Sequence, residues 1–210
     1  MGGMQGRFEG GSYAGDTIRT LPMFHGERVA QLLAFEPDPQ NFAKLETTVA
    51  SLTPETRAKI QCRMMALASE QGTLHLDSTG TASTVTSANA GTGTVAVPAD
   101  KLDALLGDAV PTILKLDIEG AEPDALLGAR NTIRAHAPIL AICVYHRQDH
   151  MWSIPLMLRE WRDDYASFLR PPNEGGWALV LYSVPPSRRI GTAPFFARPP
   201  PGPSPPVWPR

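Results

Sequence analysis

The sequence predicts an α/β fold in which a mostly parallel β-sheet is covered by helices on both faces. Apolar strand-like runs alternate along the chain with segments of helical periodicity, an order typical of parallel sheets. Residues 111–120 form a near-continuous apolar run, as expected for a strand buried on both faces. With 210 residues, 42% of them hydrophobic, the chain can bury a sizeable core, and no internal repeat or linker divides it.

The expected elements follow from local patterns. Strands are expected at 31–36, 58–67, 72–77, 94–99, 111–120, 138–146, 166–170 and 177–185, and the alternating segment 72–77 is expected to be antiparallel. Helices are expected at 39–52, 100–107, 122–137 and 152–165. Gly107 provides a helix stop, and Leu126, Ala129 and Ile133 fall on one helical stripe. Residues 78–94 are polar, small and aperiodic, which predicts a long loop that shapes a substrate pocket.

Composition and charge bear on partners and location. The formal net charge of −2 gives no electrostatic basis for binding nucleic acid or an anionic membrane. No apolar run is long enough to span a bilayer, and residues 1–11 lack the apolar centre of a signal peptide, so we expect a cytoplasmic protein. Cys62 and Cys143 each lie beside apolar residues, which favours reduced thiols in the core.

The C-terminal segment differs in composition from the rest of the chain. Residues 198–210, RPPPGPSPPVWPR, favour an extended, polyproline-like conformation. We therefore expect one domain at 1–190 and a disordered tail at 191–210. The tail is either a ligand for a proline-reading domain or an unselected extension, and the second interpretation is favoured.

A glycine-rich turn follows the start of the chain. Residues 8–18, FEGGSYAGDTI, show the spacing E-x-G-x-x-x-G through Glu9, Gly11 and Gly15 rather than the dinucleotide pattern G-x-G-x-x-G. Such a turn lets a ligand approach the backbone next to a helix N-terminus. The acid suits a ligand that carries an ammonium group, such as S-adenosylmethionine, although a plain glycine turn is an equal competitor.

Glu36 ends the strand-like run 31–36. In Rossmann-like domains an acid at the end of the second strand accepts hydrogen bonds from ribose hydroxyls. The alternative is a helix cap at EPDPQN, where Pro37 and Pro39 block a helix, but Asp38 is the better cap candidate. We therefore favour a ribose contact for Glu36.

Three acids cluster after the apolar run TILKL. Asp117 and Glu119 are two positions apart, so on an extended chain their carboxylates share one face. Two carboxylates on one face repel unless a cation, a substrate hydroxyl or a histidine lies between them. Solvated acids at a strand end would be the alternative. Glu122 opens the next helix, and we assign it a capping role toward the helix dipole.

A histidine ends the strand-like run 138–146. In the segment VYHRQDH, His146 is expected to reach the same sheet edge as Asp117 and Glu119. A histidine beside carboxylates is a candidate general base. A structural histidine is an equally good interpretation from the sequence alone.

Four segments together resemble the FkbM family of S-adenosylmethionine-dependent methyltransferases: FEGGSYAGDTI, AFEPDPQNFAKL, LKLDIEGAEPDALLGA and ICVYHRQDHMWSIP. The resemblance extends over residues 8–185 in order and spacing. It implies a Rossmann-like methyltransferase fold, with a mostly parallel seven-stranded sheet that ends in an antiparallel hairpin. It also implies methylation of a hydroxyl on a sugar, glycolipid or polyketide-like acceptor.

The resemblance also assigns site residues. It implies that Glu9, Gly11, Ser12 and Gly15 surround the methionine part of S-adenosylmethionine, that Glu36 contacts its ribose, and that Met65 and Ala66 contact its adenine. Asp117, Glu119 and His146 would line the acceptor side, with Asp117 also close to the cofactor. The family usually carries Asp where this chain has Glu9, and usually has further structure before the first strand. Because residues 1–8 are rich in glycine, we expect either a poorly formed first strand or a truncated form of the chain.

The chemistry and the class of protein each leave alternatives. An alcohol must lose its proton as it takes the methyl group, so His146, then Asp117 or Glu119, are the candidate bases. Alternatively, the two acids hold a divalent metal, but the sequence gives no full ligand set. A non-catalytic methyltransferase-like binding module is the rival class, and an NAD-dependent oxidoreductase is disfavoured because G-x-G-x-x-G is missing.

Overall fold

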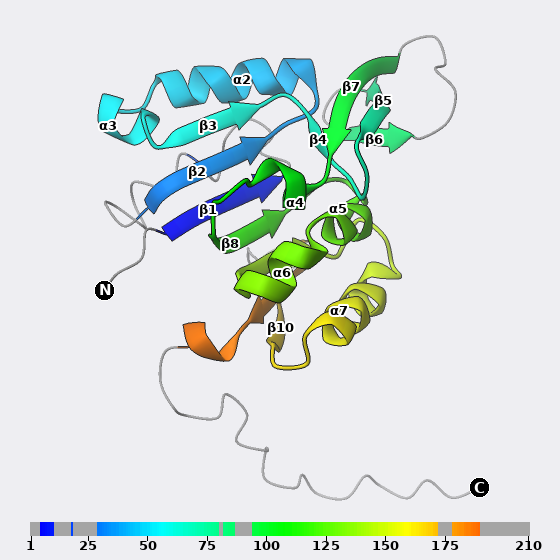
Figure 1. Ribbon diagram of the computed structural model, residues 1–210. Coiled ribbons are helices and arrows are strands. Elements are labelled where there is room, and N and C mark those ends of the chain that lie inside the picture. The colour runs from blue at the N-terminus through cyan, green and yellow to red at the C-terminus, as the bar shows by residue number, and fades with distance from the viewer. Residues whose placement is uncertain are drawn as a thin grey trace, which may run out of the picture.

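Two β-sheets and the helices packed around them form an α/β fold (Figure 1). The structure is a computed structural model that describes residues 5–10, 18, 29–79, 82–86, 94–171 and 178–189. The predicted α/β class is confirmed. The expectation of a single sheet is corrected, because the strands divide between a larger and a smaller sheet, both mixed in direction.

The larger sheet has seven strands. Their order is β10 (Ala166–Arg170), β11 (Val180–Val184), β9 (Ile139–Cys143), β8 (Pro111–Leu116), β1 (Gln5–Gly10), β2 (Val29–Phe35) and β3 (Ile60–Arg63). Strands β9, β8, β1, β2 and β3 run parallel, whereas β11 is antiparallel to both of its neighbours. The carboxyl ends of the five parallel strands therefore lie at one edge.

The smaller sheet has four strands in the order β4 (Ala66–Leu67), β7 (Thr94–Asp100), β5 (Gly72–Thr79) and β6 (Ala82–Thr86). The antiparallel strand expected at 72–77 is confirmed by the pairing of β5 with β6 and β7. The long loop predicted at 78–94 is wrong in part, because β6 lies within it. The threonines and the valine of β6 are residues that strands favour. In Figure 1 the arrowheads of β1, β2, β3 and β8 point toward this sheet.

The strand expected at 58–67 is two strands in different sheets. The chain turns after β3, where the Met65 N–H donates to the Arg63 carbonyl at 3.1 Å. Strand β1 also differs from expectation. Residues 5–10, which we expected to be poorly formed, pair with β2 on one side and β8 on the other. Neighbours on both sides satisfy the backbone groups of a glycine-rich strand that has little propensity of its own.

Helices lie on both faces of the larger sheet. They are α2 (Pro39–Ala50), α3 (Pro54–Arg57), α4 (Leu102–Leu105), α5 (Glu122–Gly128), α6 (Arg130–His136) and α7 (His150–Trp161), with a short 3-10 turn η2 (Pro186–Arg188). The helix predicted at 122–137 is two helices that meet at Ala129. Asp103 of α4 accepts hydrogen bonds from the N–H groups of Asn131 and Thr132, so the second helix has a cap supplied from another element.

Helix α2 begins where the sequence predicts. Asp38 accepts from the N–H groups of Gln40 and Asn41, both at 2.9 Å, and Pro39 occupies the first helical position. The predicted N-cap is thereby confirmed. The apolar stripe of this helix packs against β2 and β3 through Leu45 and Val49, which are buried.

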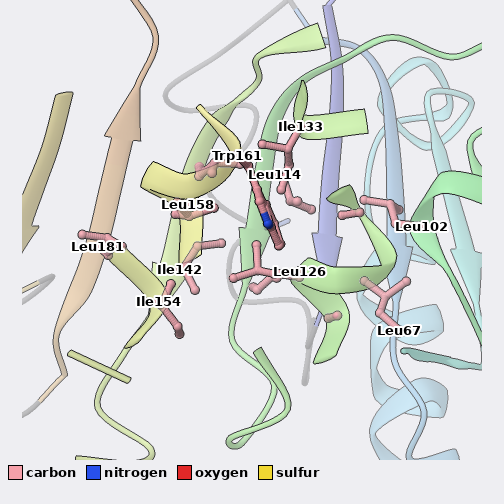
Figure 2. Packing of buried hydrophobic residues seen from close by; sticks show 14 of the residues in the cluster. Leu67, Leu102, Leu114, Leu126, Ile133, Ile142, Ile154, Leu158, Trp161 and Leu181 are labelled. Atoms are coloured by element: carbon pink, nitrogen blue, oxygen red, sulfur yellow. The ribbon is translucent and has the colours of Figure 1, made fainter. Parts of the chain in front are cut away.

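The core is divided by the larger sheet. Strand β2 contributes Leu33 and Phe35 to the larger apolar cluster, and Leu32 and Ala34 to the cluster beneath α2. Successive side chains of a strand point to opposite faces, so β2 is buried on both. Figure 2 shows the larger cluster, where residues of α7, such as Trp161, meet those of β8, β9 and α6.

The cysteines, the helices and the C-terminal tail bear on the remaining expectations. Cys62 and Cys143 are free, as predicted, and burial raises the pKa of the Cys62 thiol to about 11. None of the helices described here is long and apolar enough to cross a membrane. The tail 191–210 and its boundary at 190 lie outside the described residues.

Candidate active site

The carboxyl edge of the larger sheet collects most of the predicted site residues. From β1 the chain passes to β2 and β3 on one side, whereas β8 and β9 lie on the other. The order of strands therefore reverses between β1 and β8, and open α/β sheets bind ligands at such a switch point. Asp117 follows β8 directly, Glu36 follows β2 directly, and His146 follows β9 by three positions.

The glycine turn begins at this switch point. Glu9 lies in β1, where its backbone pairs with Ala34 of β2 and Lys115 of β8. Gly10 is the last residue of the strand. Gly11, Ser12 and Gly15 lie outside the described residues, so their assignment to the methionine part of the cofactor stays a prediction.

Glu36 is buried at the end of β2. Glu36 is 5% exposed, and its Oε1 accepts a hydrogen bond from the Asp38 N–H at 3.0 Å. Its own N–H donates to the Arg63 carbonyl, which ties the ends of β2 and β3 together. Glu36 thus supports the turn into α2.

Met65 and Ala66 lie beyond the end of β3. Met65 is half-buried and packs against the larger apolar cluster, and Ala66 is a buried residue of β4. The turn through Arg63 brings this segment beside Glu36. An apolar segment next to a buried acid suits an adenosine, in which an aromatic base adjoins a ribose.

The loop after β8 differs from the predicted strand. Strand β8 ends at Leu116, and the backbone then enters the left-handed region at Glu119, with φ 55°, and at Gly120, with φ 100°. The prediction that Asp117 and Glu119 share a face of an extended strand is therefore wrong in its geometry. Left-handed backbone is unfavourable for a glutamate and is held by surrounding contacts.

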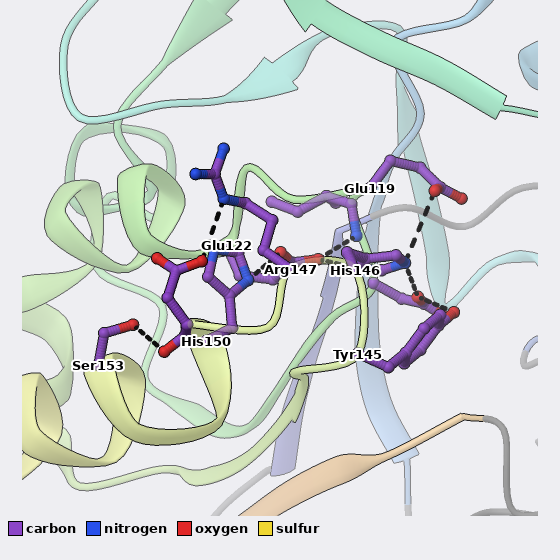
Figure 3. A network of polar contacts seen from close by, with 10 residues as sticks. Glu119, Glu122, Tyr145, His146, Arg147, His150 and Ser153 are labelled. Carbon is purple, nitrogen blue, oxygen red and sulfur yellow. Dashed lines mark hydrogen bonds and ion pairs between the residues drawn. The ribbon is translucent and has the colours of Figure 1, made fainter.

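The two acids nevertheless converge, through a histidine. His146 Nε2 lies 3.5 Å from Asp117 Oδ1 and 3.6 Å from Glu119 Oε2 (Figure 3). Asp117 Oδ1 also accepts from the Tyr145 hydroxyl at 3.2 Å, and its other oxygen lies 3.6 Å from Lys115 Nζ. The structure thus brings together the three residues predicted for the acceptor side.

Glu122 lies at the centre of the network instead of capping a helix at the surface. It is the first residue of α5 and is completely buried. Its Oε1 accepts from the Ile118 N–H at 2.9 Å and lies 2.8 Å from His146 Nδ1. Its Oε2 lies 3.4 Å from Nδ1 of the buried His150, the first residue of α7. The capping role assigned from the sequence is corrected, because this carboxylate is directed at two histidines and a loop.

The acids set the protonation of His146. Burial alone lowers the pKa of this histidine, but the hydrogen bond with Glu122 and the negative charges of Glu122, Glu119 and Asp117 outweigh it, so the pKa lies above 6.5. Burial and the charge of Asp117 raise the pKa of the Tyr145 hydroxyl, which therefore stays a neutral donor at physiological pH.

This shift predicts a pH dependence of stability. Because the pKa of His146 is higher in the folded state than the unfolded value near 6.5, its ion pairs stabilise the fold fully below that value and lose this effect as the pH rises through the folded pKa. The difference in free energy of unfolding between the protein and His146→Gln should therefore be largest at acidic pH and shrink above pH 6.5. Urea denaturation across this range measures it, and a difference that grows with pH contradicts the assigned contacts.

Three contributors to the network could not be singled out from the sequence. Glu122 looked like a helix-opening acid, and the only hint of its role was its place three positions after Glu119. His150 lies four positions after His146, but a loop separates them, so helical spacing gave no reliable signal. Tyr145 precedes His146, and their rings lie in tilted contact with centroids 4.1 Å apart. Among the described residues, no group of three or more His, Cys, Asp or Glu side chains is arranged to hold a metal ion.

The arrangement defines an α/β fold of the methyltransferase type with an acid- and histidine-lined edge. The sequence pattern of the methyltransferase FkbM domain matches residues 9–168. Because this match covers most of the chain, the protein belongs to the FkbM methyltransferase family. Among curated proteins, no sequence matches this chain.

Solved structures agree on the fold. Methyltransferase FkbM from Methylobacillus flagellatus KT superposes with a TM-score of 0.71 at 23% identity, over 86% of this chain and 43% of that one. A SAM dependent methyltransferase from Aquifex aeolicus gives 0.50 at 12% identity, over 87% and 84%. A methyltransferase from Geobacter sulfurreducens gives 0.50 at 12% identity, over 88% and 72%. The chain thus spans less than half of the Methylobacillus protein.

Proposed function

We propose that this chain is an S-adenosylmethionine-dependent O-methyltransferase that acts on a hydroxyl of a sugar, glycolipid or polyketide-like acceptor. One observation carries the proposal beyond family membership: His146 Nε2 and the carboxylates of Asp117 and Glu119 converge at the edge where the sheet reverses its strand order. An acceptor hydroxyl that reached the buried Nε2 atom would meet a base and two hydrogen-bond acceptors.

The residues on the β2 side fit the donor molecule. The buried carboxylate of Glu36 suits ribose hydroxyls, and the apolar segment at Met65 and Ala66 suits a base. Glu9 and the glycine turn are assigned to the methionine part. When bound, S-adenosylmethionine supplies a methyl group already activated by its sulfonium.

The chain contributes orientation and proton transfer. Alignment of the acceptor oxygen with the methyl carbon supplies much of the acceleration, because a bimolecular reaction becomes effectively unimolecular. As the acceptor oxygen takes the methyl group that a bound donor would supply, His146 Nε2 would accept the hydroxyl proton. Asp117 and Glu119 then stabilise the imidazolium that results.

Glu36 provides a test of the donor side. Glu36→Gln keeps the oxygen that accepts from Asp38 but removes the charge, so affinity for S-adenosylhomocysteine should fall by about 1.5–3 kcal/mol, the range for hydrogen bonds to charged groups. Titration calorimetry measures the affinity. Glu55→Gln, which removes an exposed acid from α3, should leave it unchanged. If Glu36→Gln binds S-adenosylhomocysteine as tightly as the unaltered protein but is less stable, Glu36 only supports the turn into α2.

Methyl transfer itself tests the proposal. The protein is incubated with S-adenosylmethionine carrying a labelled methyl group and a panel of sugars, glycolipids and polyketide alcohols. The proposal expects labelled methyl ether on a member of the panel, with release of S-adenosylhomocysteine. Label found on nitrogen or carbon of an acceptor, with none on oxygen, contradicts O-methylation while it retains the donor site.

A further inference from the structure

Glu122 forms a buried connection between two histidines. It has no exposed surface, and His150 is 2% exposed. One carboxylate oxygen serves Ile118 N and His146 Nδ1, and the other faces His150 Nδ1. Figure 3 shows the side chains of Glu122, His146 and His150 pointing toward one another from the first turn of α5, the loop after β9 and the first turn of α7.

The chemistry of a carboxylate fixes the hydrogen on His146. An ionised carboxylate only accepts hydrogen bonds, so the nitrogen 2.8 Å away must donate. When His146 is neutral, Nδ1 therefore carries the hydrogen and Nε2 has the free electron pair. The Nε2 atom is buried and has no hydrogen-bond partner among the described residues.

We infer that Glu122 is a positioning residue, which holds neutral His146 as the Nδ1–H tautomer so that Nε2 is directed at the site as the proton acceptor. This inference deepens the proposed function and rests on it for the identity of the reaction. His150 Nδ1 lies 3.4 Å from the second oxygen of Glu122, and neither atom has a hydrogen-bond partner among the described residues. The wrong tautomer would present an N–H to the acceptor hydroxyl and could take no proton from it.

Groups on the other side of the ring oppose Glu122. Asp117 and Glu119 face Nε2, and as acceptors they favour a hydrogen on that atom. Their distances of 3.5 and 3.6 Å exceed the 2.8 Å of the Glu122 contact, so Glu122 prevails. Tyr145 and His150 complete the titratable groups that contact the ring or its carboxylate among the described residues. The tautomer is thus set by competing acids.

The tautomer can be measured directly on the complete chain. Nitrogen-15 NMR of protein labelled at its five histidines distinguishes Nδ1–H from Nε2–H rings, and the signals missing from His146→Gln assign His146. At a pH above the pKa of His146 we expect the Nδ1–H form to exceed the other roughly ten- to a hundred-fold, as the strength of a charge-assisted hydrogen bond implies. A majority of Nε2–H, or equal populations, overturns the inference without any variant.

Two variants should shift the tautomer in opposite directions. Glu122→Gln weakens the contact at Nδ1, so the Nε2–H fraction should rise several-fold. Glu119→Gln removes the negative charge that faces Nε2 and leaves a weaker amide acceptor, so that fraction should fall. Both remove a negative charge and should lower the pKa of His146. If the Glu122 carboxylate only filled space, the two variants would not change the Nε2–H fraction in opposite directions. A change of the same sign in both variants therefore overturns the inference.

Asp149→Asn is the matched control. It removes an acid from the same loop as His146, but this acid pairs with the exposed Arg147 and should leave the tautomer unchanged. If Glu122→Gln does not fold, the spectra of the unaltered protein and of Glu119→Gln still show which tautomer of His146 predominates. None of these spectra needs S-adenosylmethionine, so a failure of the proposed reaction and a failure of the tautomer assignment are separate results.

Discussion

Replacing His146 with glutamine is expected to lower the rate of methyl transfer by about 10²–10⁴-fold, the contribution typical of a positioned general base. Glutamine keeps a polar side chain of similar reach but cannot take the hydroxyl proton at neutral pH. Affinity for S-adenosylhomocysteine should change little, because His146 lies on the β9 side of the switch point and Glu36 on the β2 side. The turnover of labelled methyl groups and calorimetry measure the two quantities.

Matched changes in the neighbouring acids separate the roles. Asp117→Asn and Glu119→Gln keep shape and remove charge, so each should reduce turnover and shift the acidic limb of its pH profile downward, because each lowers the pKa of His146. Turnover by His146→Gln at the unaltered rate would exclude His146 as the base. If Asp117→Asn binds S-adenosylhomocysteine more weakly, Asp117 contacts the methyl donor and not the acceptor.

The second large effect is on stability, at Gly128. This residue ends α5, and a β-carbon there would overlap the carbonyl oxygen of Ala68 and lie 3.3 Å from the Lys101 Cα. Ala68 cannot yield easily, because its N–H donates to the Asp100 carbonyl at 3.0 Å. Gly128→Ala should therefore destabilise the protein by about 1–3 kcal/mol or more, the range for forced overpacking. Urea denaturation provides the measurement.

Gly72→Ala is the control for that substitution. Gly72 begins β5 in the smaller sheet, and a β-carbon there would meet nothing within 4 Å. The free energy of unfolding of Gly72→Ala should stay within about 0.5 kcal/mol of that of the unaltered protein, as for most surface changes. If Gly128→Ala is equally stable, α5 does not press on the segment after β4 as the structure shows.

The predictability of the fold varied with the strength of local signals. Strand β2 and helix α2 were predictable, because the four successive apolar residues 32–35 are followed by a capping Asp38 and then by Pro39. Strand β1 was not, since a glycine-rich segment becomes a strand through pairing with its neighbours rather than through its own pattern. Strand β6 contains threonines and a valine that strands favour, but its five residues lie in a polar, aperiodic segment and give too short a signal. Contacts distant in sequence decide such cases.

The site was predictable as a set of residues but not as a geometry. Parallel strands bring their carboxyl ends together, so acids and a histidine at those ends were expected to meet. The left-handed backbone at Glu119 and the burial of Glu122 depend on how the loop after β8 folds against α7, and no local pattern encodes that packing. The close approach of Gly128 to Ala68 is hidden for the same reason.

Titration calorimetry of the complete chain with S-adenosylhomocysteine, and in parallel with NAD, distinguishes a methyltransferase from the other two classes of protein. We expect saturable binding of S-adenosylhomocysteine at one site per chain, weakened in Glu36→Gln, and no binding of NAD over the same range. Binding of NAD in preference would support an oxidoreductase. Absence of binding by either ligand, from a protein shown to be folded by circular dichroism, would contradict the methyltransferase assignment and favour a binding module without chemistry.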